Sequence, residues 1–297
     1  MEGHMKRNNI KILTAVLALL LLLSGCINAQ KEEEEGTTAP IDMNDINPSS
    51  IGSYKTMEYR YFTNVDVTRL TTNLDKAYLI LANKTTALGE DYEPSSMEAL
   101  TCKKLESGRT YMLESRAAQA LYAMLAEMQA EDVTDIMVAS AYRSYDKQLT
   151  TYESHLKREM NEISSDAYRV FGSEYIQMNY LDKKIYKLTL EDAHTVVQSY
   201  SALPGQSEHQ TGLCIDFATY EEGDEPLTEA FETTAAYRWL SQNAYKFGFI
   251  LRYPEGKENI TGYTYEPWHY RFVGREAATD IYNGGMTLEQ YLQLVAE

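Results

Sequence analysis

Two short stretches of the chain hold the residues best suited to bind a metal ion. The first contains His209 and Asp216, and the second contains Glu266 and His269, in a chain with only five histidines. Two imidazoles and one carboxylate fill three positions of a tetrahedral zinc ion and leave the fourth to water, which is the arrangement of a catalytic site. Glu266 lies three residues before His269 and is placed to act as a general base on that water. The pattern therefore predicts a hydrolase with one Zn²⁺ per chain.

The spacing of these residues decides whether they can meet at one ion. Seven positions separate His209 from Asp216, and Gly212 between them allows the chain to turn. Glu266 precedes a proline and is therefore pushed toward extended backbone. Strict strand alternation would send Glu266 and His269 to opposite faces. If both reach the metal, this segment must bend, twist or lie at the end of a strand.

Each residue taken alone also has a purely structural explanation. A single histidine such as His209 is as often a satisfied surface or core residue as a ligand. A lone tryptophan such as Trp268 is more often a core anchor than the wall of a pocket. Unrelated residues seldom assemble into a full set of ligands with a base, so the combination favours the metal site.

Four motifs follow one another in the chain. They are Ser-Ala-Tyr-Arg-Ser-Tyr at 140–145 with Gln148, Pro-Gly-Gln-Ser-Glu-His-Gln-Thr-Gly at 204–212, Asp216, and Glu-Pro-Trp-His at 266–269. Together they resemble the zinc D-alanyl-D-alanine carboxypeptidases of the VanY type, LAS metallopeptidases related to the D-Ala-D-Ala dipeptidases and to hedgehog-like folds. The resemblance covers residues 78–297. It implies an α+β fold in which a small antiparallel sheet, flanked by helices, carries the metal in a cleft.

The same resemblance implies a role for each residue. One Zn²⁺ would be held by His209, Asp216 and His269, with Glu266 as general base and acid. Arg143 would contact the substrate near the scissile bond or its terminal carboxylate. The residues expected to line or frame the substrate pocket are Tyr142, Gln148, Ser201, Ser207 and Trp268.

An arginine suits the recognition of a carboxylate, because its guanidinium is planar, permanently charged and able to form two parallel hydrogen bonds. A free carboxylate bound at a fixed distance from the metal makes the enzyme an exopeptidase that removes one C-terminal residue. The expected function is therefore that of a zinc D,D-carboxypeptidase, which removes the terminal D-Ala from peptidoglycan stem peptides.

Three other functions remain open on the residues alone. An L,D-carboxypeptidase on the same fold would remove D-Ala from a tetrapeptide stem, and the ligand motifs do not separate the two activities. A non-catalytic lipoprotein that binds wall peptides would have no need for the base Glu266. A solute-binding lipoprotein would be expected to have two larger lobes and no zinc ligands.

Two features depart from the pattern of the family. Cys214 stands where a small apolar residue such as alanine is usual, either as a tolerated small core residue or as a soft donor near the zinc that can be oxidised. The tyrosine-rich stretch at 152–186 is longer than the family minimum and is expected to cover or reshape the cleft. Cys102 and Cys214 are expected to be free thiols rather than a disulfide.

The N-terminal residues indicate secretion and lipid attachment. Residues 1–25 are expected to form a lipoprotein signal peptide with a short cloning remnant, because a basic start precedes an apolar run too short to span a bilayer. The lipobox-like Leu-Ser-Gly-Cys ends at Cys26, whose lipid would anchor the protein outside the cytoplasm; an ordinary cleaved signal is the alternative. Residues 26–53 read as a disordered acidic tether, 54–77 as an extension and 78–297 as the zinc carboxypeptidase domain.

The overall charge excludes one class of partner. The formal charge of −17 argues against nucleic acid, which requires a basic surface. The expected partners are a peptidoglycan stem peptide and, through the lipid anchor, the membrane; a monomer is expected.

The apolar patterns predict interleaved strands and helices without a regular βαβ rhythm, so α+β with an antiparallel sheet is the expected class. The expected strands are 78–84, 135–140, 213–217, 249–253 and 268–273. The expected helices are 115–129, capped by Ser115, 147–161, 164–187, 190–199, and 233–247, closed by Gly248.

Overall fold

The computed structural model describes residues 41–159, 190–223 and 226–296. The expected signal peptide, Cys26, the tether up to residue 40 and the helix at 164–187 lie outside the described residues. Within the described ranges, no helix has both the length and the apolar character that a membrane crossing requires.

Four antiparallel strands form the central sheet, in the order β3-β4-β6-β5. Their bounds are β3 Met137–Ser140, β4 Cys214–Ala218, β5 Phe249–Leu251 and β6 His269–Phe272. The register places Asp216 between its two neighbours, opposite Ser140 on one side and His269 on the other. A second sheet pairs β1 (Met97–Ala99) with β2 (Met112–Glu114). The expected α+β class with a small antiparallel sheet is confirmed.

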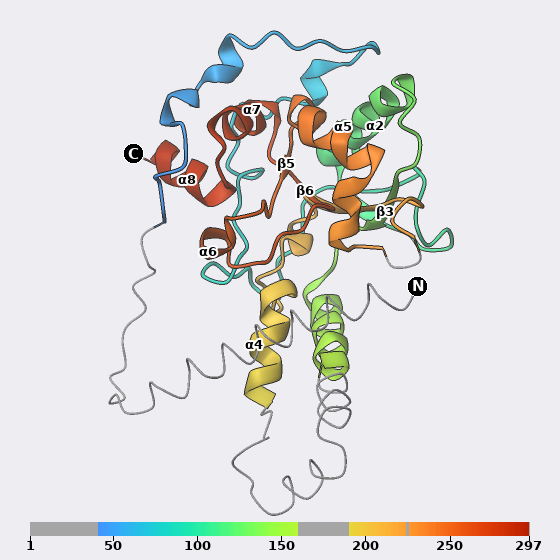
Figure 1. Cartoon of the computed structure of the whole chain (residues 1–297), viewed down its shortest axis with the longest axis vertical. Coiled ribbons are helices and arrows are strands. Elements are labelled where there is room, and N and C mark those ends of the chain that lie inside the picture. The colour runs from blue at the N-terminus through green and yellow to red at the C-terminus, as the bar shows by residue number, and fades with distance from the viewer. Residues whose placement is uncertain (1–40, 160–189, 224–225, 297) are drawn as a thin grey trace, which may run out of the picture. The chain divides into compact units, whose positions relative to one another are not determined.

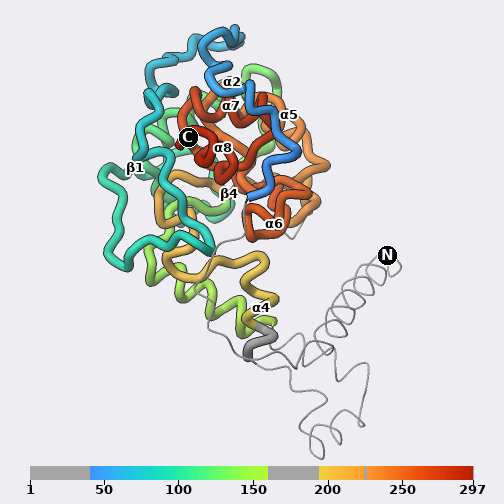
Figure 2. The backbone as a smooth tube through the Cα atoms, turned by 90° about the vertical axis from the view of Figure 1, so that its left-hand side faces the viewer, coloured from blue at the N-terminus to red at the C-terminus, as the bar shows by residue number. Residues whose placement is uncertain are grey.

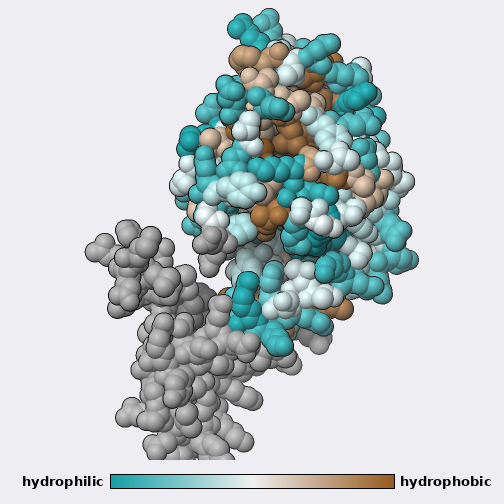
Figure 3. Space-filling view, turned by 90° about the vertical axis from the view of Figure 1, so that its right-hand side faces the viewer, coloured by the Kyte–Doolittle hydropathy of each residue, from teal (hydrophilic) through white to brown (hydrophobic). Residues whose placement is uncertain are grey.

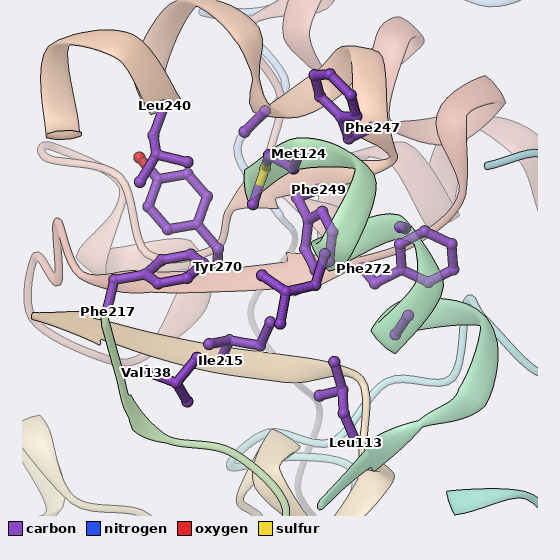
Figure 4. Close-up of a cluster of buried hydrophobic side chains, with 14 of the residues drawn as sticks. Leu113, Met124, Val138, Ile215, Phe217, Leu240, Phe247, Phe249, Tyr270 and Phe272 are labelled. Atoms are coloured by element: carbon purple, nitrogen blue, oxygen red, sulfur yellow. The ribbon is translucent and has the colours of Figure 1, made fainter. Parts of the chain in front are cut away.

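The central sheet has one apolar and one polar face, because alternate side chains of a strand point to opposite sides. Figure 4 shows the apolar face, where Ile215, Phe217, Tyr270 and Phe272 meet side chains from the covering helices. Those helices are α2 (Ser115–Ala130), α5 (Ala235–Asn243) and the 3-10 turn η6 (Ala244–Phe247). The opposite face carries the intervening residues of β4 and β6, which are Cys214, Asp216, Ala218, His269 and Arg271.

Two helices lie side by side beyond the polar face of the sheet (Figure 1). They are the helical residues 145–159 and α4 (Leu190–Tyr200). The hydroxyl of Tyr152 lies 2.7 Å from Nδ1 of His194, and the two rings stack. The two helices therefore hold each other through polar and aromatic contacts.

The C-terminal part consists of α6 (Glu258–Thr261), α7 (Arg275–Gly284) and α8 (Leu288–Ala296). Figure 2 shows the N-terminal segment running over α7 and α8. Two carboxylates of α7 hold this segment. Asp280 accepts hydrogen bonds from the backbone of Gly52 (2.7 Å) and the hydroxyl of Ser53 (2.9 Å), and Glu276 accepts them from the backbone of residues 72 and 73. Three 3-10 turns shape the segment: η1 Pro48–Ser50, η2 Ser53–Lys55 and η3 Val67–Arg69.

This packing corrects the expected domain boundaries. Residues 41–53 are not a disordered tether, since they hydrogen bond to α7 and α8 and belong to the same compact unit as the rest of the described chain. The expected extension at 54–77 is likewise part of that unit. The polar composition of the segment does not predict this packing, because the carboxylates that bind it lie more than 200 residues away in the sequence.

Other local predictions were also wrong. Residues 78–84 form no strand; the carbonyls of Tyr78 and Ile80 instead accept hydrogen bonds from the guanidinium of Arg271. The cap of α2 is the side chain of Glu114 rather than Ser115. The helix expected at 233–247 is divided into η5 (Glu229–Thr233), α5 and η6, although it does end at Gly248, whose φ of 86° suits glycine.

One face of the described structure is largely hydrophilic. Figure 3 shows a face on which hydrophilic residues predominate and apolar residues form small patches. Both Cys102 and Cys214 are free, as expected.

Candidate active site

His209 is held by a short, tightly closed turn. It lies in the 3-10 turn η4 (Glu208–Thr211), which Ser207 caps at its start and Gly212 closes with a φ of 68°. The imidazole Nδ1 donates a hydrogen bond to the carbonyl of Ala141 at 2.6 Å. This bond fixes the ring and turns Nε2 toward Asp216, where it lies 3.1 Å from Oδ2.

His269 meets the same carboxylate from the neighbouring strand. The pairing of β4 with β6 sets His269 opposite Asp216, and its Nδ1 lies 2.8 Å from Oδ1. The rings of His209 and His269 are perpendicular, with centroids 5.2 Å apart. All three side chains are buried. One carboxylate thus joins two imidazoles, and the electrostatics agree: burial raises the pKa of Asp216, but the two histidines outweigh it and hold the pKa well below its usual range.

These three side chains fit a tetrahedral zinc ion. Metal bonds of about 2.0–2.2 Å require ligand atoms roughly 3.4 Å apart. The two nitrogen–oxygen separations, 3.1 Å to Oδ2 and 2.8 Å to Oδ1 of Asp216, are a few tenths of an ångström shorter. Two imidazoles and one carboxylate are a donor set that zinc takes. Cys214 lies beside them: ligand atoms of His209, Cys214 and His269 are all within 4.8 Å of one another. Both readings of Cys214, as a small core residue or as a soft donor, stay open.

Glu266 reaches the same place because the chain bends before β6. The backbone N–H of His269 donates to the carbonyl of Glu266 at 3.1 Å, which closes a turn over Glu-Pro-Trp-His. The turn brings Oε2 of Glu266 to 3.6 Å from Nδ1 of His269, so the bend required by the sequence is present. Burial raises the pKa of Glu266 to about 7, helped by the nearby Asp216 and opposed by the cationic neighbours His269, His209 and Arg143. A carboxylate with such a pKa can both accept and return a proton near neutrality.

A network of buried charges lies behind the two histidines. Glu208 accepts hydrogen bonds from Arg252 (2.9 Å) and Arg271 (2.6 Å) on the same oxygen, Oε1. Arg252 also forms a two-pronged pair with Glu289, at 2.9 and 2.5 Å. Burial raises the pKa of Glu208, but the two guanidinium groups dominate and hold it well below its usual range. Glu208 is therefore ionised at neutral pH.

A cavity of about 470 Å³ opens beside the histidines. Arg143, Gln148, Ser201, Ser207 and Trp268 are among the residues that line it, together with His209, Asp216, Glu266 and His269. Tyr142 is not among them; it is half-buried, and its backbone pairs with β2. The structure thus brings together every residue singled out from the sequence for the metal or substrate except Tyr142.

Arg143 is fixed relative to the first histidine by the main chain. Its backbone N–H donates to the carbonyl of His209 at 3.1 Å. Its side-chain Nε is buried without a hydrogen-bond partner among the described residues. A buried donor without an acceptor is costly, so a ligand that supplies the acceptor is favoured there.

Sequence reasoning missed several residues of the cavity. Glu208 was visible beside His209, but only the fold shows that both arginines of the network converge on it. His155 also lines the cavity, with Nδ1 2.9 Å from the hydroxyl of Ser201. Burial, with help from two nearby arginines, lowers the pKa of His155 to about 4, so its imidazole is neutral at neutral pH. A lone histidine in a polar helix carries no signal of such a position.

Comparisons with known proteins agree with this geometry. The sequence profile of the VanY family, described as D-alanyl-D-alanine carboxypeptidase, matches residues 110–275, more than half of the chain. The Bacillus subtilis protein YodJ is 36% identical over 219 residues, which are 73% of this chain and 67% of YodJ.

Solved structures show the same relationship. The L,D-carboxypeptidase LdcB is similar with a TM-score of 0.56 and 34% identity, over 72% of this chain and 84% of LdcB. A D,D-pentapeptidase VanY in complex with Zn(II) is similar with a TM-score of 0.51 and 33% identity, over 73% of this chain and 99% of that one. The structure of VanYB in complex with D-Ala-D-Ala is similar with a TM-score of 0.52 and 33% identity, over 73% of this chain and 97% of VanYB.

The profile match and the coverage of these relatives settle the family, and the Zn(II) complex agrees with the donor set of this site. The chain belongs to the VanY family of D-alanyl-D-alanine carboxypeptidases.

Proposed function

We propose that this protein is a zinc-dependent D,D-carboxypeptidase that removes the C-terminal D-Ala from peptidoglycan stem peptides. The observation that carries the proposal is the position of Glu266, a buried carboxylate with a pKa near 7, beside the His209–Asp216–His269 cluster in a cavity that also contains Arg143. A base, a metal site and a carboxylate-binding cation within one cavity are the parts that an exopeptidase needs.

The metal is assigned to Nε2 of His209, the carboxylate of Asp216 and Nδ1 of His269. These are the atoms that already converge, at 3.1 and 2.8 Å. Bound zinc lowers the pKa of a water ligand toward neutrality and polarises the scissile carbonyl. The bond from His209 to the carbonyl of Ala141 supports this assignment, because it holds the ring in the tautomer that presents Nε2.

Glu266 is assigned the proton transfers. As a carboxylate it accepts a proton from the attacking water, and as a carboxylic acid it returns that proton to the departing amine. Its burial supports both roles, since a carboxylate in water would be too weak a base to hold the proton at neutral pH. A protein that only binds wall peptides has no use for a base in this position.

Arg143 is assigned to the substrate carboxylate. Its guanidinium lines the cavity, and its buried Nε lacks an acceptor in the described structure. A terminal carboxylate would supply that acceptor and a second bond in parallel. The rest of the substrate pocket is assigned to the other residues that line the cavity, which are Gln148, Ser201, Ser207 and Trp268. Tyr142 does not line the cavity, so its assignment rests on the sequence motif alone.

The alternative activity on a tetrapeptide is not excluded by the metal site. The chain is similar both to a D,D-pentapeptidase and to an L,D-carboxypeptidase. The family profile is that of D-alanyl-D-alanine carboxypeptidases, which favours the D,D activity. The deciding contacts are those made to the residue before the scissile bond.

Purified protein with zinc should release D-Ala from a stem pentapeptide ending in D-Ala-D-Ala faster than from the matching tetrapeptide. Glu266→Gln should retain zinc but lose about two to four orders of magnitude in kcat, because an amide cannot accept the proton. Released D-Ala is measured for each peptide. Preference for the tetrapeptide would establish the L,D activity, and release from neither peptide would reject the proposed function.

Zinc content tests the ligand set directly. The parent should bind one zinc ion, whereas His209→Ala should lose most of it, because two protein ligands hold zinc far more weakly than three. Metal analysis after dialysis gives the ratio for both proteins. His155→Ala is the matched control, since that histidine lines the same cavity but contacts Ser201 and is not one of the assigned ligands. Full zinc occupancy in His209→Ala would reject the assignment.

Replacement of Arg143 by lysine should separate substrate recognition from stability. Lysine keeps the charge but cannot form two parallel bonds, so kcat/KM should fall about tenfold or more, the effect of losing a charged hydrogen bond of about 1.5–3 kcal/mol. The melting temperature should barely change. Arg109→Lys, at an exposed i,i+3 ion pair, is the control and should behave as the parent. Equal activity of Arg143→Lys and the parent would assign Arg143 a structural role.

The same proposal places the protein outside the cytoplasm as a monomer held to the bacterial membrane by lipid on Cys26. The support is the sequence alone: a basic start, a short apolar run and Leu-Ser-Gly-Cys. Cys26→Ser should move the protein from the detergent phase to the aqueous phase, or into the medium, when cells are extracted with detergent. Unchanged partitioning would show that the apolar run itself is the anchor.

A further inference from the structure

Two buried polar atoms behind the metal site lack hydrogen-bond partners in the described structure: Nε2 of His269 and Oε2 of Glu208. They face each other at 3.8 Å. Buried polar atoms are rarely left without partners, because each costs about 1–3 kcal/mol. A movement of less than about 1 Å would bring them to the usual hydrogen-bond distance of roughly 2.9 Å.

The surrounding charges leave Oε2 of Glu208 without a hydrogen bond in the described structure. Arg252 and Arg271 both donate to Oε1, so the carboxylate is held in one orientation. Arg271 follows His269 by two residues on β6, and both side chains therefore leave the strand on the same face. The backbone thus delivers a histidine and an arginine together to the two oxygens of one carboxylate.

The other ring nitrogen of His269, Nδ1, faces the proposed metal site. Nδ1 lies against Asp216, at the position assigned to zinc. A histidine that binds a metal through Nδ1 carries its proton on Nε2, which then requires an acceptor. In the described part of the chain, Oε2 of Glu208 is the buried acceptor that lacks a bond and faces this atom.

We propose that Glu208 is a positioning residue for the metal site: it accepts a hydrogen bond from the Nε2–H of His269, fixes the ring and raises its affinity for zinc. This inference rests on the proposed ligand set, but concerns metal binding rather than hydrolysis. It gives the buried network of Glu208, Arg252 and Arg271 a function beyond neutralising its own charges. The arginines orient the carboxylate, and the carboxylate orients the ligand.

The substitution Glu208→Gln tests this contact sharply. The two guanidinium groups demand an oxygen at the position of Oε1, so the amide oxygen must occupy it. The amide NH₂ then faces the Nε2–H of His269, and two donors meet. Zinc affinity should therefore fall by about 10–100-fold, the usual effect of losing a partner of a metal-binding histidine.

Glu289→Gln is the matched control. Glu289 is buried and pairs with the same Arg252, but its hydrogen bonds go to Arg252 and Asn83 rather than to a histidine. Both variants remove one negative charge from the network and should lower the melting temperature of the metal-free protein. Only Glu208→Gln should weaken zinc binding beyond this common effect on folding.

The measurement is the zinc dissociation constant of each folded protein, by competition with a chromophoric chelator. The visible spectrum of the Co²⁺-substituted protein supplies a second readout, since it reports ligand geometry, and it should change in Glu208→Gln but not in Glu289→Gln. Equal zinc affinity of Glu208→Gln and the parent, or equal weakening in both variants, would overturn the proposal. Weakening in Cys214→Ala but not in Glu208→Gln would do the same and assign the contact to the thiol.

These outcomes are separate from those of the proposed function. If the parent binds zinc but releases no D-Ala, the function fails while the role of Glu208 is still decided by the affinities. If the parent hydrolyses the peptide and Glu208→Gln binds zinc normally, only the role of Glu208 fails.

Discussion

The site depends on the register between β4 and β6. Antiparallel pairing places Asp216 opposite His269, and the turn before β6 adds Glu266 to the same side. A shift of one residue would exchange the faces of a strand, sending a ligand into the apolar core and a core residue to the site. The alternation that buries Ile215 and Phe217 against α2 and α5 therefore also aims Asp216 at the metal. The register of β4 and β6 thus determines both the packing of the core and the positions of the site residues.

Burying this many charges requires a compensating arrangement. Ionised groups away from water are tolerated only when they are paired and hydrogen bonded. Here Arg252 and Arg271 offset Glu208 and Glu289, while Asp216 lies between the two imidazoles. Removing one member leaves its partner unpaired, so these residues constrain one another. The polar layer is a stiff support for the ligands because its geometry has few alternatives.

Much of the chemistry could be predicted from the sequence, because the metal ligands and the base lie in two compact motifs. The strands that carry them also follow from their apolar alternation, as with β4 and β6. Contacts distant in sequence could not be predicted. No local sequence pattern predicts the hydrogen bonds from residues 52–54 to α7. The same holds for the hydrogen bond from Arg252 to Glu208. Residues 78–84 are apolar enough for a strand, yet their carbonyls go to Arg271 instead of a neighbouring strand.

The second sheet, formed by β1 and β2, affects how the enzyme would select the length of its substrate. The carbonyl of Met112 in β2 accepts the N–H of Tyr142, and the N–H of Glu114 donates to the carbonyl of Gly212. The segment before Arg143 and the turn after His209 are thus fastened to the same short strand. Under the proposed role of Arg143, these main-chain hydrogen bonds fix the backbone of Arg143 relative to the turn that carries His209. The enzyme would then select its substrate by the length of one residue between the terminal carboxylate and the scissile bond.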